Sequence, residues 1–264
     1  MAAHRDTVIE QFTRQAPRYA AAPPINDGAL PGLLVALSAV SASERVLDVA
    51  CGPGIVTAAF AAAARTAVGL DLVEAMLGRA RTHARELGLA NVEFLTGDAN
   101  ALPFEDGAFD VVVSRFALHH LERPGTAVAE MARVCAEGGR VVVCDVAPSP
   151  DTADAFNAME LLRDPSHTRA LTEEQLLELL AATGALAEPA VTRSGFALEL
   201  EEQLARSFPA SEADALAFRR MFEDSLADDR LGVGAVRRGT TIEYAFPVCT
   251  VVALRCAPGA RDGG

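Results

Sequence analysis

The spacing of apolar and polar residues predicts two helices before the first strand of the chain. An apolar stripe recurs at helical spacing within residues 8–16. Thr7 and Glu10 stand at the separation of a capping box, and Pro17 is expected to end this helix. A second apolar helix is expected over about residues 28–39. Because both precede the first strand, we expect them to cover the sheet that follows.

From residue 44 onward, short apolar runs alternate with helical periodicities. Helices are expected over residues 54–64, 73–88 and 124–138, the last opened by Pro124 and closed by Gly138-Gly139. Apolar strands separated by helices form a parallel, doubly wound α/β sheet that is covered on both faces. The five strands are expected at residues 45–49, 66–70, 92–95, 109–113 and 140–146.

After residue 150 the pattern is less regular. Asp151 is expected to cap a helix that runs to about Arg163, and Thr172 with Gln175 a second helix that stops at Gly184. We interpret 196–229 as a charged, helical lid. One or two closing strands are expected within 241–255. The chain therefore divides into an N-terminal helical cover (1–43) and a core (44–150). A lid with late core helices (151–240) follows, and the chain ends in closing strands with a disordered tail (241–264).

Composition and charge narrow the possible partners. The 264 residues carry a formal net charge of −13, which repels phosphate backbones and anionic membrane surfaces, so neither a nucleic acid nor a membrane is expected as a partner. The five cysteines lack metal-ligand spacing, which indicates reduced thiols and no metal site. No leader-like or membrane-spanning apolar run is seen. We expect a cytoplasmic monomer or homodimer that acts on a small molecule.

The turn after the first strand is the strongest chemical feature. Gly52 and Gly54 allow the backbone to approach a ligand where a Cβ atom would clash. Asp71 ends the second strand, where a carboxylate can accept hydrogen bonds from two ribose hydroxyls. Together these residues indicate a cofactor that contains adenosine.

The same turn separates two classes of cofactor. A dinucleotide fingerprint needs a third glycine, and here Ile55, Val56 and Thr57 follow Gly54. Asp48 lies inside the motif, where a carboxylate would repel a pyrophosphate but suits an ammonium and a sulfonium group. This contrast favours S-adenosylmethionine over NAD.

These residues resemble the class I S-adenosylmethionine-dependent methyltransferases, especially the ubiquinone/menaquinone C-methyltransferase-like enzymes of small molecules. The resemblance covers about residues 44–146 and implies a seven-stranded Rossmann-like sheet, mostly parallel, with the last strand antiparallel. It rests on five segments: Asp-Val-Ala-Cys-Gly-Pro-Gly at 48–54, Gly-Leu-Asp-Leu at 69–72, Gly-Asp-Ala-Asn-Ala-Leu-Pro-Phe at 97–104, the fourth-strand motifs at 109–112 and 118–121, and Gly-Gly-Arg-Val at 138–141.

The resemblance also implies roles in binding the cofactor. Ala50 and Gly52 would contact its methionine part, Asp71 its ribose, and Asp98 with the Ala99 N–H its adenine. Asp98 is alternatively a turn-forming residue. Leu72 and Met76 would form apolar walls, although they fit the core equally well, and Tyr19 would be a lid contact. The remaining candidates are Gly54, the embedded carboxylate Asp48, and Arg115, for which a structural role is the alternative.

The acceptor side is less determined. His119 and His120 follow the fourth strand and are candidates for a general base, as is His167; packing or capping is the alternative. Arg163 and Arg169 can dock an anionic group, although a solvated loop explains them as well. The third substrate candidate is Phe116.

The sequence therefore predicts transfer of a methyl group from S-adenosylmethionine to a carbon, oxygen or nitrogen atom of a small metabolite. Three alternatives stay open. One is a cyclase or isomerase that retains the cofactor on the same fold, and another is a module that only senses it. The third is an NAD-dependent oxidoreductase.

Overall fold

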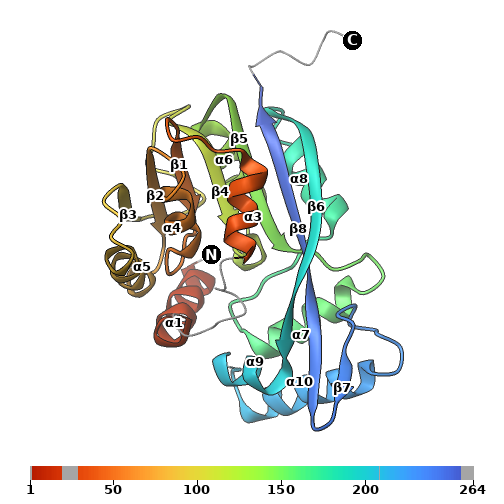
Figure 1. Ribbon diagram of the computed structural model, residues 1–264. Helices are drawn as coiled ribbons and strands as arrows, with labels where there is room; N and C mark the ends of the chain where they lie inside the picture. Colours follow the sequence, from red (N-terminus) through yellow and green to blue (C-terminus); the bar gives the residue numbers. More distant parts are fainter. Residues whose placement is uncertain (1, 20–28, 208, 257–264) are drawn as a thin grey trace.

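The computed structural model describes residues 2–19, 29–207 and 209–256. Its centre is one mixed sheet with the strand order β3-β2-β1-β4-β5-β8-β6 (Figure 1). The first five strands pair in parallel, whereas β8 runs antiparallel to both β5 and β6. Their bounds are β1 Arg45–Val49, β2 Thr66–Asp71, β3 Val92–Thr96, β4 Phe109–Arg115, β5 Cys135–Val146, β6 Leu186–Glu199 and β8 Thr241–Arg255. The α/β, doubly wound fold is confirmed, and a short β7, Val236–Arg238, adds a hairpin to β8.

Helices cover both faces of this sheet. On one face α3, Ala29–Ser38, and α4, Ile55–Ala61, pack on β1, β4 and β5. On the other face lie α6, Pro124–Val134, and α8, Glu173–Ala181. Successive side chains of a strand point to opposite faces, so Val111 and Val113 join the first core and Val112 the second. Beside α4, α5, Glu74–Glu86, packs on β2 and β3.

A second, smaller core lies beyond the sheet. The far ends of β6 and β8 extend past their neighbours (Figure 1) and carry α7, Ala153–Arg163, α9, Leu200–Arg206, and α10, Glu212–Ser225. Phe156, Phe218, Phe222, Tyr244 and Phe246 fill the space between them. We call this part the lobe. Helix α1, Ala2–Tyr19, contacts both α5 of the sheet layer and α9 of the lobe.

The predicted boundaries were wrong in four places. Pro17 lies inside α1, because packing on α5 and α9 outweighs the missing N–H near the helix end. Thr7 donates its hydroxyl to the Ala3 carbonyl and caps nothing. Helix α6 ends at Val134, so Gly138 lies within β5. The N-cap of α7 is Thr152, one residue after Asp151.

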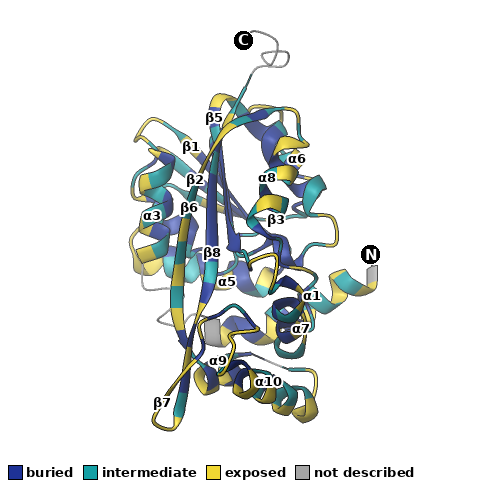
Figure 2. Cartoon of the chain, turned by 90° about the vertical axis from the view of Figure 1, so that its right-hand side faces the viewer, coloured by how far each residue is buried: buried dark blue, intermediate teal, exposed yellow. Residues whose placement is uncertain are grey.

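Two strands, β6 and the short β7, were missed and one capping motif was confirmed. Strand β6 occupies residues in and before the predicted helical lid, and Figure 2 shows it alternating between partly buried and exposed positions beside the buried β8. The Thr172–Gln175 capping box of α8 is present as predicted. The predicted closing strand is the single 15-residue β8. The predicted disordered tail from Ala257 lies outside the described residues.

Candidate active site

Two cavities adjoin along the carboxyl ends of the parallel strands. The first, here the strand-edge cavity, measures about 920 Å³ with its open mouth and lies over the ends of β1, β2 and β4. The second, the lobe cavity, measures about 720 Å³ and lies between that edge and the lobe. Phe12, Phe116 and His120 line both cavities, so these three side chains form their common boundary.

The backbone bends sharply at the floor of the strand-edge cavity. Ala50 (φ 57°), Gly52 (φ 53°) and Phe116 (φ 54°) all have left-handed backbones and line it. Such conformations cost about 1–3 kcal/mol for residues other than glycine and gather at functional sites. Gly54 (φ 77°) has a different role, because an added Cβ would lie 2.7 Å from the Ala80 Cβ. It allows α4 to pack closely on α5 and does not line the cavity.

Asp48 is a buried carboxylate on the wall of this cavity. The Thr57 hydroxyl donates to its Oδ2 at 2.6 Å. Burial raises the pKa of Asp48 to about 7, although the Thr57 hydrogen bond and the charge of Arg115 oppose this shift. A nearby cation would lower that pKa and keep the group ionised. The wall therefore suits a cationic ligand.

Asp71 and Asp98 both line the cavity and both order backbone turns. Asp71 accepts hydrogen bonds from the N–H groups of Gly52 and Val73, each at 2.8 Å, which fastens the glycine turn to β2. Asp98 Oδ1 accepts the Asn100 N–H at 2.8 Å, so its turn-forming role is present too. Carboxylate oxygens have further lone pairs for a ligand.

The structure gathers almost all of the predicted cofactor residues around this cavity. Gly54 lies outside it, and the Tyr19 side chain lies outside the part of the chain that the structure describes. Sequence reasoning missed the contribution of Val8 and Phe12, which reach the cavity from α1 only through tertiary packing. The predicted residues that line the cavity are Asp48, Ala50, Gly52, Asp71, Leu72, Met76, Asp98, Ala99 and Arg115.

Of the three candidate histidines, His119 is placed to act as a base. Its Nδ1 lies 2.5 Å from Asp145 Oδ1, and both side chains are buried. Burial would lower the pKa of His119, but the charge and hydrogen bond of Asp145 outweigh it and raise that pKa. Asp145 also accepts the N–H groups of Leu118 and Val146, so its position is fixed. The other ring nitrogen of His119, Nε2, has no hydrogen bond to any described residue, and His119 lines the lobe cavity.

His120 and His167 are held in neutral form. Burial lowers the pKa of each to about 3. His120 Nδ1 lies 3.1 Å from the carbonyl oxygen of Ser166. His167 Nε2 lies 2.7 Å from Asn157 Oδ1, and His167 lines neither cavity. The prediction that His167 is catalytic is not supported by this placement.

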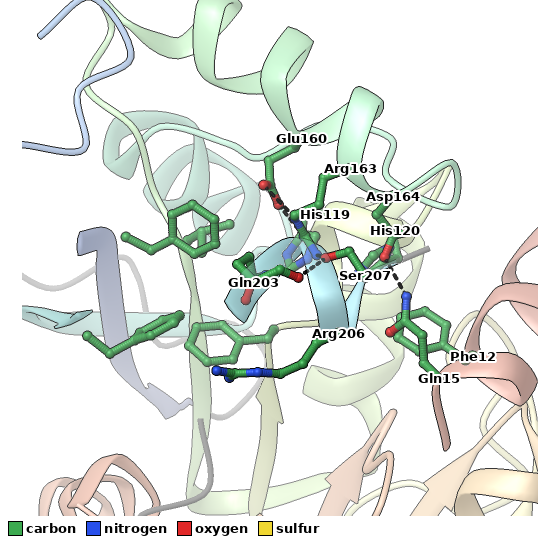
Figure 3. A pocket seen from close by; sticks show the side chains of 14 residues that line it. Phe12, Gln15, His119, His120, Glu160, Arg163, Asp164, Gln203, Arg206 and Ser207 are labelled. Atoms are coloured by element: carbon green, nitrogen blue, oxygen red, sulfur yellow. Dashed lines mark hydrogen bonds and ion pairs between the residues drawn. The ribbon is translucent and has the colours of Figure 1, made fainter. Parts of the chain in front are cut away.

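The predicted arginines are already paired. Arg163 lines the lobe cavity, but it forms a two-pronged ion pair with Glu160 and donates to Ser207 (Figure 3). Arg169 is half exposed, pairs with Asp154 at 3.2 Å and lines neither cavity. Phe116 lies between the two cavities as a substrate contact requires. Sequence reasoning missed the α9 residues Gln203 and Arg206, which also line the lobe cavity, because no local pattern marked them.

Comparison with known proteins points to one family. The family model "Methyltransferase domain" matches residues 47–143. The uncharacterized methyltransferase YcgJ of Bacillus subtilis is 36% identical over 160 residues, 60% of this chain and 63% of that protein. Its crystal structure superposes with a TM-score of 0.79 at 26% identity, covering 86% of this chain and 98% of the other.

Two other relatives support the assignment. The uncharacterized protein YafE of Escherichia coli is 32% identical, and the match covers 61% of this chain and 78% of YafE. The ubiquinone/menaquinone C-methyltransferase UbiE of Dinoroseobacter shibae is 37% identical, over 51% of this chain and 56% of UbiE. The chain thus spans less than two thirds of the length of YcgJ and UbiE. Within the described residues, no helix is long and apolar enough to cross a membrane.

Proposed function

The chain belongs to the class I S-adenosylmethionine-dependent methyltransferases, and from this premise we propose that it methylates a small metabolite across the boundary between its two cavities. S-adenosylmethionine occupies the strand-edge cavity, and the acceptor occupies the lobe cavity. The observation that carries the proposal is that Phe12, Phe116 and His120 line both cavities. In-line displacement needs the nucleophile about 3 Å from the methyl carbon, which only adjoining sites allow.

The strand-edge cavity suits this cofactor chemically. Asp48 supplies a buried negative charge for the ammonium and sulfonium groups of the cofactor. Asp71 keeps lone pairs for ribose hydroxyls, and Asp98 with the Ala99 N–H suits the adenine edge. Leu72 and Met76 supply apolar walls, and Met76 also packs with Ala16 and Val73 in a small core, so it serves both roles. A dinucleotide would bring a pyrophosphate to Asp48, and this is unfavourable.

His119 is the base in this proposal. His119 lines the lobe cavity and its Nδ1 is bound to Asp145, so its Nε2 would take the proton that an acceptor hydroxyl or activated carbon loses as it bonds to the methyl group. When bound, S-adenosylmethionine would supply the methyl group, and His119 would hold the proton that the acceptor gives up. His120 and Phe116 position the reactants at the boundary between the two cavities, and neither takes up the proton of the acceptor.

Incubation with S-adenosylmethionine and a fractionated metabolite pool tests the proposal. Mass spectrometry should find S-adenosylhomocysteine together with a product that is heavier by one CH2 group, and Asp48→Asn should reduce both. Turnover of a metabolite without release of S-adenosylhomocysteine would favour the cyclase alternative. Dependence on NAD instead would overturn the proposal.

A further inference from the structure

Unpartnered buried polar atoms gather on the α9 side of the lobe cavity. Among the described residues, the amide oxygen of Gln203 and Nη1 of Arg206 are fully buried and have no hydrogen-bond partner. Both residues line the cavity, where Figure 3 shows them on α9. Buried polar groups in folded proteins almost always have hydrogen-bond partners. Two unpartnered polar atoms in residues that line one cavity therefore indicate a binding site for a ligand or a water molecule.

Arg206 differs from the other arginine of this wall. The guanidinium of Arg163 donates hydrogen bonds to Glu160 and Ser207. Arg206 makes one ion pair, from Nη2 to Glu202 at 2.7 Å, and Glu202 is mostly exposed. Solvent screens such a pair. The buried Nη1 of Arg206 therefore keeps two N–H donors and much of its charge for a ligand.

A neutral group of the cavity wall can complete the contact. The amide oxygen and nitrogen of Gln203 can exchange places by rotation, so this side chain can donate as well as accept. Gln203 is 5% exposed, which fixes it in the wall. One cationic and one neutral donor, from Arg206 and Gln203, fit a planar oxyanion.

The rest of the cavity limits the size and charge of the ligand. Phe116 and Phe196 lie with their rings 5.4 Å apart, and Phe246 continues this surface, so the cavity offers an aromatic wall. The carboxylates of Glu160 and Asp164 line the same cavity, and Glu160 pairs with Arg163 and not with Arg206. A dianion such as a phosphate would meet these carboxylates, whereas a monoanion needs only Arg206.

We propose that Arg206 and Gln203 anchor a carboxylate of the acceptor, which is a flat, mostly apolar acid. This inference rests on the proposed function for the identity of the lobe cavity as the acceptor site. The carboxylate lies toward α9, and the atom that receives the methyl group lies toward His120 and Phe116, which border the strand-edge cavity. The anionic handle is thus held by α9 and not by Arg163 or Arg169.

Binding of two matched probes tests the anchor without knowledge of the natural acceptor. 2-Naphthoate and its neutral amide, 2-naphthamide, are titrated by calorimetry into protein saturated with S-adenosylhomocysteine. We expect the acid to bind at least about tenfold more tightly than the amide, as a charge-assisted hydrogen bond implies. Equal affinity, or binding of neither probe, would overturn the proposal.

Variants of Arg206 and Gln203 show whether the difference in affinity between the acid and the amide arises at α9. Arg206→Met should weaken binding of the acid about tenfold or more and leave the amide within twofold. The matched control is Arg169→Met, which removes the same charge from an exposed residue outside both cavities and should change neither probe. A loss in the control equal to that in Arg206→Met would refute a specific anchor. Gln203→Leu serves as a second variant if Arg206→Met does not fold, and it should weaken the acid more than the amide.

The same samples separate this inference from the proposed function. Each variant is also titrated with S-adenosylhomocysteine alone, which should bind unchanged because Arg206 and Gln203 do not line the strand-edge cavity. Failure of wild-type protein to bind S-adenosylhomocysteine contradicts the proposed function. Failure of the naphthoate titration with intact cofactor binding contradicts only the anchor.

Discussion

Three histidines within one cluster show that surroundings decide the role of a residue. The rings of His119 and His120 lie 4.2 Å apart, and those of His119 and His167 lie 5.6 Å apart. Burial lowers the pKa of all three and the charge of a nearby carboxylate opposes it at each, but only at His119 does the carboxylate, the hydrogen-bonded Asp145, outweigh burial. The sequence showed a histidine pair, and it could not show that Asp145, from the end of β5, would select one member.

Replacement of Asp145 by Asn should lower the pKa of His119. The substitution keeps the shape of the side chain and removes the charge that outweighs burial, while Glu160 and Arg163 still act on the ring. Titration of the His119 ring signals by NMR measures the shift, and the acidic limb of the kcat/KM profile should move to lower pH. The control Asp154→Asn, at an exposed site, should leave the titration unchanged. An unaltered His119 pKa in Asp145→Asn would remove Asp145 from the mechanism.

Asp48 should release a proton when S-adenosylmethionine binds near pH 7. Burial places its pKa at about 7 in the free protein, so part of the population is protonated, and a cationic ligand lowers that pKa. Calorimetry in buffers of different ionisation enthalpy counts the protons. Asp48→Asn keeps an acceptor for Thr57 but should abolish the release and weaken binding about tenfold. The same proton release in the variant would assign it to another group.

At the scale of the elements, apolar periodicity predicted the helices and strands that are held by packing in the apolar core. Strands β1, β2 and β4 and the second half of β5 are mostly buried, and the carboxyl ends of the parallel strands brought Asp48, Asp71 and Asp98 to one cavity as the sequence indicated. Strand β6 escaped notice because it mixes partly exposed residues with Pro189 and Gly195. Its extended form comes from pairing along β8.

The residues that line the lobe cavity could not be predicted from local sequence patterns. Gln203 and Arg206 stand on a short helix whose position depends on α1, β6 and β8, so no local pattern indicated their meeting with His119. Arg163 was predicted by its charge, but its ion pair with Glu160 became visible only with the side chains of α7 in place. Local sequence therefore predicted the lining of the strand-edge cavity better than that of the lobe cavity.

The β1–α4 turn should be sensitive to a single methyl group. Gly54→Ala should destabilise the protein by about 1–3 kcal/mol, since the added Cβ meets Ala80 and the backbone has a positive φ. Gly78→Ala is the matched control: nothing lies within 4 Å of its added Cβ in α5, so it should stabilise by about 0.5–1 kcal/mol. Urea unfolding measures both. Equal effects of the two substitutions would contradict the close packing of α4 on α5.

At the scale of the molecule, one sheet supports both sites. Its parallel half ends at the strand-edge cavity, while β6 and β8 remain paired from Leu186 to Glu199 and carry the lobe beyond it (Figure 1). Helix α1 joins the two parts, since Phe12 lines both cavities and Gln15 donates to Asp164 of the lobe at 3.1 Å. The predicted lid, 196–229, begins with the last residues of β6 and continues as the helices α9 and α10 of the lobe.

The central claim is that the strand-edge cavity binds S-adenosylmethionine. A calorimetric titration of the purified chain with S-adenosylhomocysteine, run beside one with NAD, tests it most directly. We predict saturable binding of one S-adenosylhomocysteine per chain, at least about tenfold weaker binding in Asp71→Ala, and no binding of NAD. Binding of NAD in preference to S-adenosylhomocysteine, or an affinity for S-adenosylhomocysteine that Asp71→Ala does not change, would contradict the account.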